Sequence, residues 1–179
     1  MTPKEIYEQL DNIEYGWVDN DGAKHCKLQP ILFSKIYMLQ TPEELTKSKL
    51  GVCWDQVELE RFYFSKTNLK FHSYDILYVN KNQMPNHTFF VYEENNKYYW
   101  FEHAFEKYKG IHEYSDLKSL LLEVKEAFVT TEIKDKYGYE YNEKCLNIFE
   151  YAEPKEHLGC EEFYNHFMNS KNVTNIIKE

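Results

Sequence analysis

The sequence predicts an α+β domain in which helices precede an antiparallel β-sheet. Apolar residues recur at helical spacing before residue 64, three segments rich in β-forming residues follow between residues 71 and 102, and helical spacing returns after residue 115. Strands that follow each other without an intervening helix pair antiparallel rather than as parallel βαβ units. A chain of 179 residues can bury one sizeable core, so we expect residues 1–179 to form a single domain.

Two helix starts are marked in the N-terminal part of the chain. Residues 3–14 are predicted to form a helix that is capped by Thr2 and has Pro3 at its first position. Its apolar face consists of three residues, Ile6, Leu10 and Ile13. A second helix is predicted to begin after Thr41 and to end near Gly51. These segments form the N-terminal helical part of the predicted fold.

The middle of the chain is predicted to hold one helix and three strands. Residues 53–64 have a helical pattern. The three strands are expected at residues 71–80, 87–93 and 97–102. Asn95 and Asn96 favour a two-residue turn between the last two strands, because asparagine tolerates the left-handed conformation that a tight hairpin needs. Residues 80–86 are rich in turn-forming residues and precede the second strand.

Two more helices are predicted after the strands. Residues 116–129 carry the clearest apolar stripe, and Ser115 is the predicted cap of this helix. Residues 159–169 form the last predicted helix. The order of helices, consecutive strands and helices again is typical of α+β proteins.

The composition disfavours several classes of partner. A formal net charge of −9 argues against nucleic acid and anionic membranes, because both attract clustered Lys and Arg. No segment reaches the roughly 20 apolar residues of a membrane span, and residues 1–17 lack the apolar centre of a signal peptide, so we expect a cytoplasmic protein. Its four cysteines are expected to be free thiols, and the lack of a CxxC pair argues against structural zinc.

Cys53 is the strongest candidate for a chemical centre. It follows Gly51 at the junction of a loop and a predicted helix, where unpaired N–H groups stabilise a thiolate and can hold a developing oxyanion. Asp55 and Gln56 lie in the same first turn, where acids and amides are common for other reasons. Two upstream side chains are candidates for a second oxyanion donor, Trp17 and Gln29. A lone cysteine is more often a small buried hydrophobe, so the assignment depends on partners.

His87 and Glu102 are the predicted partners of Cys53. A cysteine nucleophile needs a base that later returns its proton to a leaving group, and histidine does this near neutral pH. With a two-residue turn at residues 95–96, His87 and Glu102 point to the same face of the hairpin as diagonal neighbours. The carboxylate can then orient the imidazole, whereas His103 points to the opposite face. A register shift of one residue would exchange Glu102 and His103.

These motifs together resemble the transglutaminase-like superfamily, which are papain-related cysteine enzymes with Cys, His and Asp in chain order. The matching elements are Gly51-Val52-Cys53, His87-Thr88-Phe89-Phe90-Val91 and Trp100-Phe101-Glu102. The resemblance covers about residues 45–105 and implies a papain-like or transglutaminase-like core, with the nucleophile at the start of a central helix. The sequence departs from the family pattern because Glu102 replaces Asp and lies one position closer to Trp100.

We therefore expect a cysteine hydrolase or acyltransferase, such as a protease or amidase, that acts through Cys53, His87 and Glu102. Its substrate would be a peptide, a protein or a small amide, and the chemistry needs no cofactor and no metal. A second hypothesis is an inactive module of the same fold that holds a peptide or small ligand in an aromatic cleft. A third is a metal site made by Cys53, His87 and His103, which the opposite orientation of the two histidines disfavours.

Overall fold

The computed structural model describes residues 1–81 and 83–178 of the chain and confirms the predicted α+β class. Within these residues, six α-helices flank a six-stranded sheet in which all neighbouring strands are antiparallel. None of the helices in the described part of the chain is long and apolar enough to cross a membrane. Asn82, which belongs to the turn-rich stretch predicted before His87, lies outside the described residues.

The helices are α1 (Pro3–Gln9), α2 (Pro30–Ile36), α3 (Pro42–Ser48), α4 (Cys53–Phe64), α5 (Leu117–Phe128) and α6 (Cys160–Met168). The strands of the main sheet are β3 (Lys70–Tyr78), β4 (Asn86–Glu94), β5 (Lys97–Glu102), β6 (Gly110–Tyr114), β7 (Leu146–Glu150) and β8 (Lys171–Asn172). Their spatial order is β6-β5-β4-β3-β7-β8, so β3 and β4 are the central strands. A separate two-stranded sheet pairs β1 (Trp17–Val18) with β2 (Lys24–His25).

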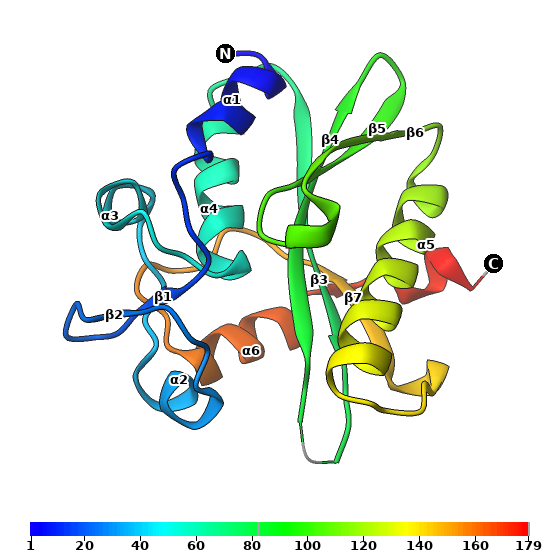
Figure 1. Cartoon of the computed structure of the whole chain (residues 1–179). Helices are drawn as coiled ribbons and strands as arrows, with labels where there is room; N and C mark the ends of the chain where they lie inside the picture. Colours follow the sequence, from blue (N-terminus) through cyan, green and yellow to red (C-terminus); the bar gives the residue numbers. More distant parts are fainter. Residues whose placement is uncertain (82, 179) are drawn as a thin grey trace.

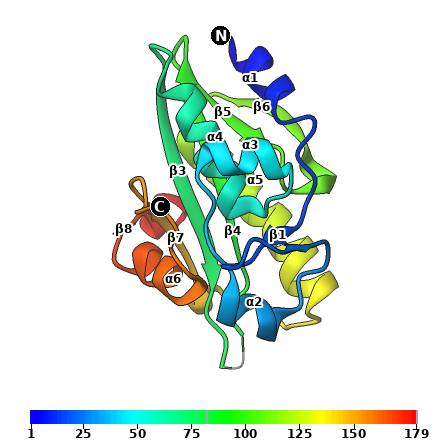
Figure 2. The same cartoon turned by 90° about the vertical axis from the view of Figure 1, so that its left-hand side faces the viewer.

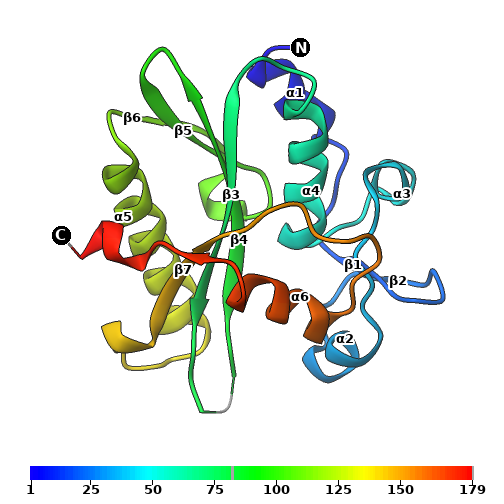
Figure 3. The same cartoon turned by 180° about the vertical axis from the view of Figure 1, so that it is seen from behind.

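The helices cover the two faces of the sheet unequally. Figure 1 shows α4 on one side of β3 and β4, and α5 on the other. α1, α2 and α3 gather around α4 on its side of the sheet (Figure 2). Figure 3 shows the molecule from behind, with α6 near the lower end of α4 and next to α2. The N-terminal end of α4, which begins at Cys53, is therefore surrounded by elements from several parts of the chain.

Most predicted element starts are confirmed by local hydrogen bonds. Thr2 and Thr41 both form capping boxes, with Glu5 and Glu44 as the respective partners. α1 ends at Gln9 rather than near residue 14, because the chain leaves the helix through turns that still bury Leu10 and Ile13. The predicted Ser115 cap of α5 is wrong. Asp116 caps this helix, because its carboxylate accepts the backbone N–H of Ser119 at 2.7 Å.

The hairpin between β4 and β5 has the predicted two-residue turn. Asn95 and Asn96 have φ angles of 53° and 60°, as a type I′ turn requires. Glu94 therefore pairs with Lys97, and the register continues to the pair of Phe90 and Phe101. This is the register on which the predicted meeting of His87 and Glu102 depends.

Two apolar cores fill the space on either side of the sheet. Alternate residues of β4 serve each core. Phe90 and Tyr92 belong to the core beneath α4 and α6, whereas Phe89 and Val91 belong to the core beneath α5. Such strict alternation follows from the two-residue period of a strand that is buried on both faces. The central strands are thus held rigidly from both sides.

Several elements were not predicted from the sequence. α2 has no fully buried residue, and its apolar residues Leu32, Phe33 and Ile36 pack only partly buried against the core beneath α4. β6, β7 and β8 are short, with five, five and two residues. A π-helical segment, Val129–Lys136, extends α5. β7 is a second antiparallel neighbour of β3. The segment that leads to α6 therefore starts from the main sheet.

Replacing Phe64 tests the core beneath α4. Phe64 is fully buried and its ring packs against Phe90, Tyr92 and Phe101. We expect F64A to lower the free energy of unfolding by about 3–5 kcal/mol, measured by urea denaturation. The matched control is F62A in the same helix, where the side chain is 41% exposed and the expected loss is below about 1 kcal/mol. Equal losses in both variants would contradict the assigned packing.

Candidate active site around Cys53

Cys53 is the first residue of α4, as predicted. Val52 is the N-cap in extended conformation, so the chain enters the helix directly at the cysteine. Gly51 lies two residues before Cys53, and its backbone is packed closely against neighbouring side chains. A Cβ atom at this position would lie 2.7 Å from Leu45 Cδ1 and 2.9 Å from Asp55 Cβ. A larger residue would push this loop away. The glycine therefore serves close packing of the loop that delivers the thiol.

Asp55 and Gln56 hold this loop, a role that was not predicted from the sequence. Asp55 Oδ2 accepts the Val52 N–H at 3.0 Å, and Gln56 Nε2 donates to the Gly51 carbonyl at 2.9 Å. Asp55 also accepts hydrogen bonds from Tyr37 and from the backbone of residue 40. Burial raises the pKa of Asp55 to about 7, although these hydrogen bonds act to lower it. The first turn of α4 thus fixes its own entry loop.

His87 and Glu102 meet as the hairpin register predicts. His87 Nε2 lies 2.8 Å from Glu102 Oε2, and both side chains are buried. The pairing of β4 with β5 begins at Phe90, so His87 lies beyond the last pair of this ladder. There the thiol of Cys53 is near enough to the ring to raise the pKa of His87. Glu102 occupies Nε2 of the ring, so Nδ1 is the nitrogen left for another partner.

Four donors converge on the Glu102 carboxylate. Oε2 accepts from Trp100 Nε1 at 3.0 Å in addition to its contact with His87. Oε1 accepts the backbone N–H groups of Ala104 at 3.0 Å and Phe105 at 2.8 Å. Trp100 and Glu102 are two residues apart on a strand, so they share a face. The two-residue spacing between Trp100 and Glu102 therefore brings the indole N–H to this carboxylate. This spacing is one residue shorter than in the pattern of the transglutaminase-like superfamily.

The electrostatic setting of His87 favours its protonated form. Burial disfavours a charged ring, but the negative charge of Glu102, its hydrogen bond to the ring and the nearby Cys53 outweigh this effect. The pKa of His87 is therefore raised well above its usual value. A protonated imidazole beside a thiol at a helix N-terminus is the setting in which cysteine nucleophiles occur.

The other candidate residues do not join this group. His103 points away from Glu102, and its Nδ1 lies 2.7 Å from Gln56 Oε1. Among the described residues, no group of three or more His, Cys, Asp or Glu side chains is arranged to hold a metal ion. The indole N–H of Trp17 donates to the Lys27 carbonyl at 2.9 Å, so it is already occupied.

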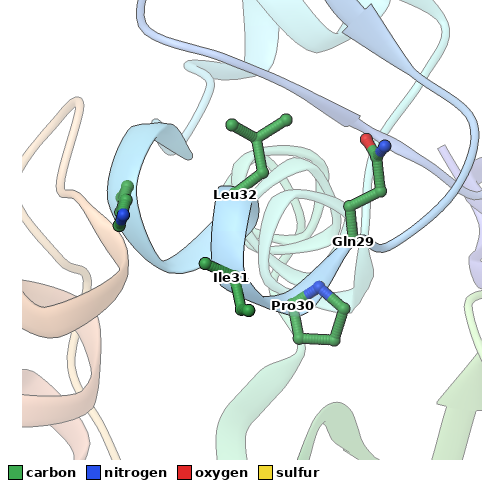
Figure 4. A pocket seen from close by; sticks show the side chains of 5 residues that line it. Gln29, Pro30, Ile31 and Leu32 are labelled. Atoms are coloured by element: carbon green, nitrogen blue, oxygen red, sulfur yellow. The ribbon is translucent and has the colours of Figure 1, made fainter.

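Gln29, the other upstream candidate, lines a surface pocket of about 380 Å³ on α2. Figure 4 shows it beside Pro30, Ile31 and Leu32. Gln29 has a φ angle of 48° and makes no capping hydrogen bond with the helix that follows it. Cys53, His87 and Glu102 do not line this pocket. The pocket therefore lies on the surface, away from the buried side chains of Cys53, His87 and Glu102.

Two further buried carboxyl groups lie near the triad. Glu60 lies about two helical turns after Cys53 on α4, and its Oε2 has no hydrogen-bond partner among the described residues. Burial and the negative charge of Glu102 raise its pKa well above the usual range. Asp75 on β3 is fully buried, and its Oδ2 likewise has no partner in the described part of the chain. Burial raises the pKa of Asp75 to about 7.

Comparison of the sequence with models of known protein families finds no match, and comparison with curated proteins finds none either. The grouping of Cys53, His87 and Glu102 is therefore supported by their motifs and by their geometry.

The buried carboxyl of Asp75 makes the stability depend on pH. Its pKa is raised when the protein folds, so the unfolded chain loses this proton first as the pH rises. This group therefore lowers stability progressively between about pH 4 and pH 7. We expect the free energy of unfolding of D75N, relative to wild type, to rise by roughly 2–4 kcal/mol between pH 4 and pH 8. Urea denaturation at both pH values measures it, and a constant difference would contradict the assignment.

Proposed function

We propose that the protein is a cysteine hydrolase or acyltransferase that acts on an amide or peptide-like bond. The observation that carries this proposal is the 2.8 Å contact between His87 Nε2 and Glu102 Oε2, with Cys53 near enough to the ring to raise the pKa of His87. These positions support the roles that the proposal assigns. The nucleophile begins a helix, the base lies near it, and the carboxylate holds one ring nitrogen of the base.

The resemblance to the transglutaminase-like superfamily supports the same proposal. Cys53, His87 and Glu102 follow each other in the chain order of that family, with the nucleophile at the start of a helix and the base at the start of a strand. Glutamate replaces the aspartate of the family pattern, and its extra methylene group fits the shared acceptance of hydrogen bonds from Trp100 and the chain after it. The papain-like core belongs to this proposal as well.

In the first half of the reaction, the Cys53 sulfur attacks the carbonyl carbon of the amide and a C–S bond forms. The carbonyl electron pair moves to the oxygen, which accepts the N–H of Cys53, because the first residues of a helix have no intrahelical acceptor. Protonated His87 then gives its proton to the amide nitrogen. The C–N bond breaks, the amine leaves and an acyl-enzyme remains.

In the second half, water or an acceptor amine attacks the acyl carbon. His87 takes the proton of the attacking group while the C–S bond breaks. The products are a carboxylic acid or a new amide, and the thiolate of Cys53 and protonated His87 are restored. Glu102 keeps the ring oriented throughout.

A second candidate function is a binding module without turnover. The observation that favours it is the burial of Cys53, whose exposed fraction is only 6%. A substrate carbonyl reaches the sulfur only if neighbouring side chains move. In this reading the aromatic residues around the N-terminal end of α4 hold a peptide or small ligand, and the buried polar group is structural.

Thiol reactivity distinguishes the two functions. We expect iodoacetamide at pH 6 to label Cys53 at least about ten times faster than Cys145, because an imidazolium beside the sulfur stabilises its thiolate. Peptide mapping by mass spectrometry gives both rates in one sample. Cys145 is a suitable internal reference, because its side chain is more exposed than that of Cys53. A Cys53 that reacts no faster than Cys145 would overturn the catalytic proposal.

Removing the charge of Glu102 tests the third member of the triad. We expect E102Q to slow the labelling of Cys53 at pH 6 by about tenfold or more, because the amide no longer stabilises the charged ring of His87. E113Q is the control, because Glu113 pairs with Lys97 on the exposed part of the sheet and should leave the rate unchanged. Unchanged labelling in E102Q would limit the site to Cys53 and His87.

A further inference from the structure

A second set of buried hydrogen bonds lies directly beside the triad. Asn86 precedes His87 at the start of β4, and its Nδ2 donates to Asp75 Oδ1 at 2.6 Å. Asp75 belongs to β3, where its neighbour on β4 is Thr88, so the contact links the two central strands at the level of His87. The only hydrogen-bond partner of the Asp75 carboxylate among the described residues is this amide. The backbone entering His87 is therefore fixed from the β3 side.

Tyr164 of α6 fixes the same backbone from the other side. Its hydroxyl donates to the Met84 carbonyl at 2.8 Å and lies 3.3 Å from Asn86 Oδ1. Together with Asp75, it holds both ends of the Asn86 amide. Burial is the main cause that raises the pKa of Tyr164, and the nearby groups of Cys160, Asp75 and Cys53 raise it further. The hydroxyl is therefore a donor at all physiological pH values.

Tyr164 also connects this anchor to the nucleophile. Its ring packs edge-on against Trp54, with ring centroids 5.4 Å apart. Trp54 directly follows Cys53 in the first turn of α4. One tyrosine thus contacts the residue after the nucleophile and the residue before the base. The two catalytic candidates come from different elements, and this contact spans the space between those elements.

We propose that Asp75, Asn86 and Tyr164 are positioning residues that set the distance between Cys53 and His87. This inference rests on the proposed function and adds residues that do not touch the reacting atoms. Without the Tyr164 hydroxyl, the chain at Met84 and Asn86 loses its tie to α6, and the His87 ring is free to move away from the thiol. A small displacement has a large effect, because the attraction within an ion pair and its hydrogen bond depend steeply on distance and alignment.

The charged groups that face His87 come from three elements. Cys53 and Glu60 belong to α4, Glu102 ends β5, and Asp75 belongs to β3. Three donors to Glu102, from Trp100, Ala104 and Phe105, involve neither His87 nor Tyr164. Loss of the Tyr164 hydroxyl should therefore loosen the Cys53–His87 contact while the His87–Glu102 contact stays intact.

The test compares Y164F with the wild-type protein by the rate of Cys53 alkylation with iodoacetamide between pH 5 and pH 9. Phenylalanine keeps the ring against Trp54 and removes only the two hydrogen bonds. We expect the rate at pH 6 to fall by about tenfold and the rate at pH 9 to stay within about twofold. Imidazole NMR titration should show a lower pKa for His87 in the variant, which a general loss of stability would not produce.

Two further variants keep the test decisive. Y141F is the control, because the Tyr141 hydroxyl is buried without a hydrogen-bond partner in the described residues, and it should leave the pH profile unchanged. N86A removes the anchor from the other end and should reproduce the Y164F profile if Y164F is too unstable to study. A wild-type pH profile in folded Y164F or N86A would overturn the positioning role. If wild-type Cys53 shows no selective labelling at pH 6, the proposed function itself fails instead.

Discussion

The buried carboxylate of Glu102 is the constraint on which the rest of the site depends. A carboxylate that is only 2% exposed is costly unless donors surround it, and here Trp100, Ala104, Phe105 and His87 supply four. Two of these donors belong to the chain just after β5. The end of the strand, the bend that follows it and the orientation of the imidazole are therefore set by one side chain.

The site is built where two layers of the fold meet. Along β4 and β5, His87 and Glu102 alternate in step with Phe89 and Trp100, which face α5. Cys53 instead begins α4 on the other side of the sheet. The β4–β5 ladder begins only at Phe90, so His87 is paired with β3 but not with β5. Glu102 therefore reaches His87 through its side chain, beyond the last pair of the ladder.

Burial of polar groups is the common feature of this region. Asp55, Gln56, Glu60 and Asp75 are all almost inaccessible, and two of them carry an oxygen without a partner in the described residues. Such groups lower stability, and a domain tolerates them when two large apolar cores offset the loss. The aromatic clusters on both faces of the sheet have this role here. Rigid surroundings then hold the thiol and the imidazole in one arrangement, a requirement that catalysis by proton transfer shares with specific binding.

The sequence by itself determined the local features of this protein. Capping residues marked α1 and α3, the helical pattern marked α4, and Asn95-Asn96 determined a hairpin register that brings His87 to Glu102 rather than to His103. Only the tertiary structure decided the features that depend on long-range contacts. These are the pairing of β7 with β3, the Asp55 and Gln56 hold on the loop before Cys53, and the link from Tyr164 to Asn86. Turn and cap preferences act over a few residues, whereas Tyr164 and Asn86 are 78 positions apart and meet only when the sheet has formed.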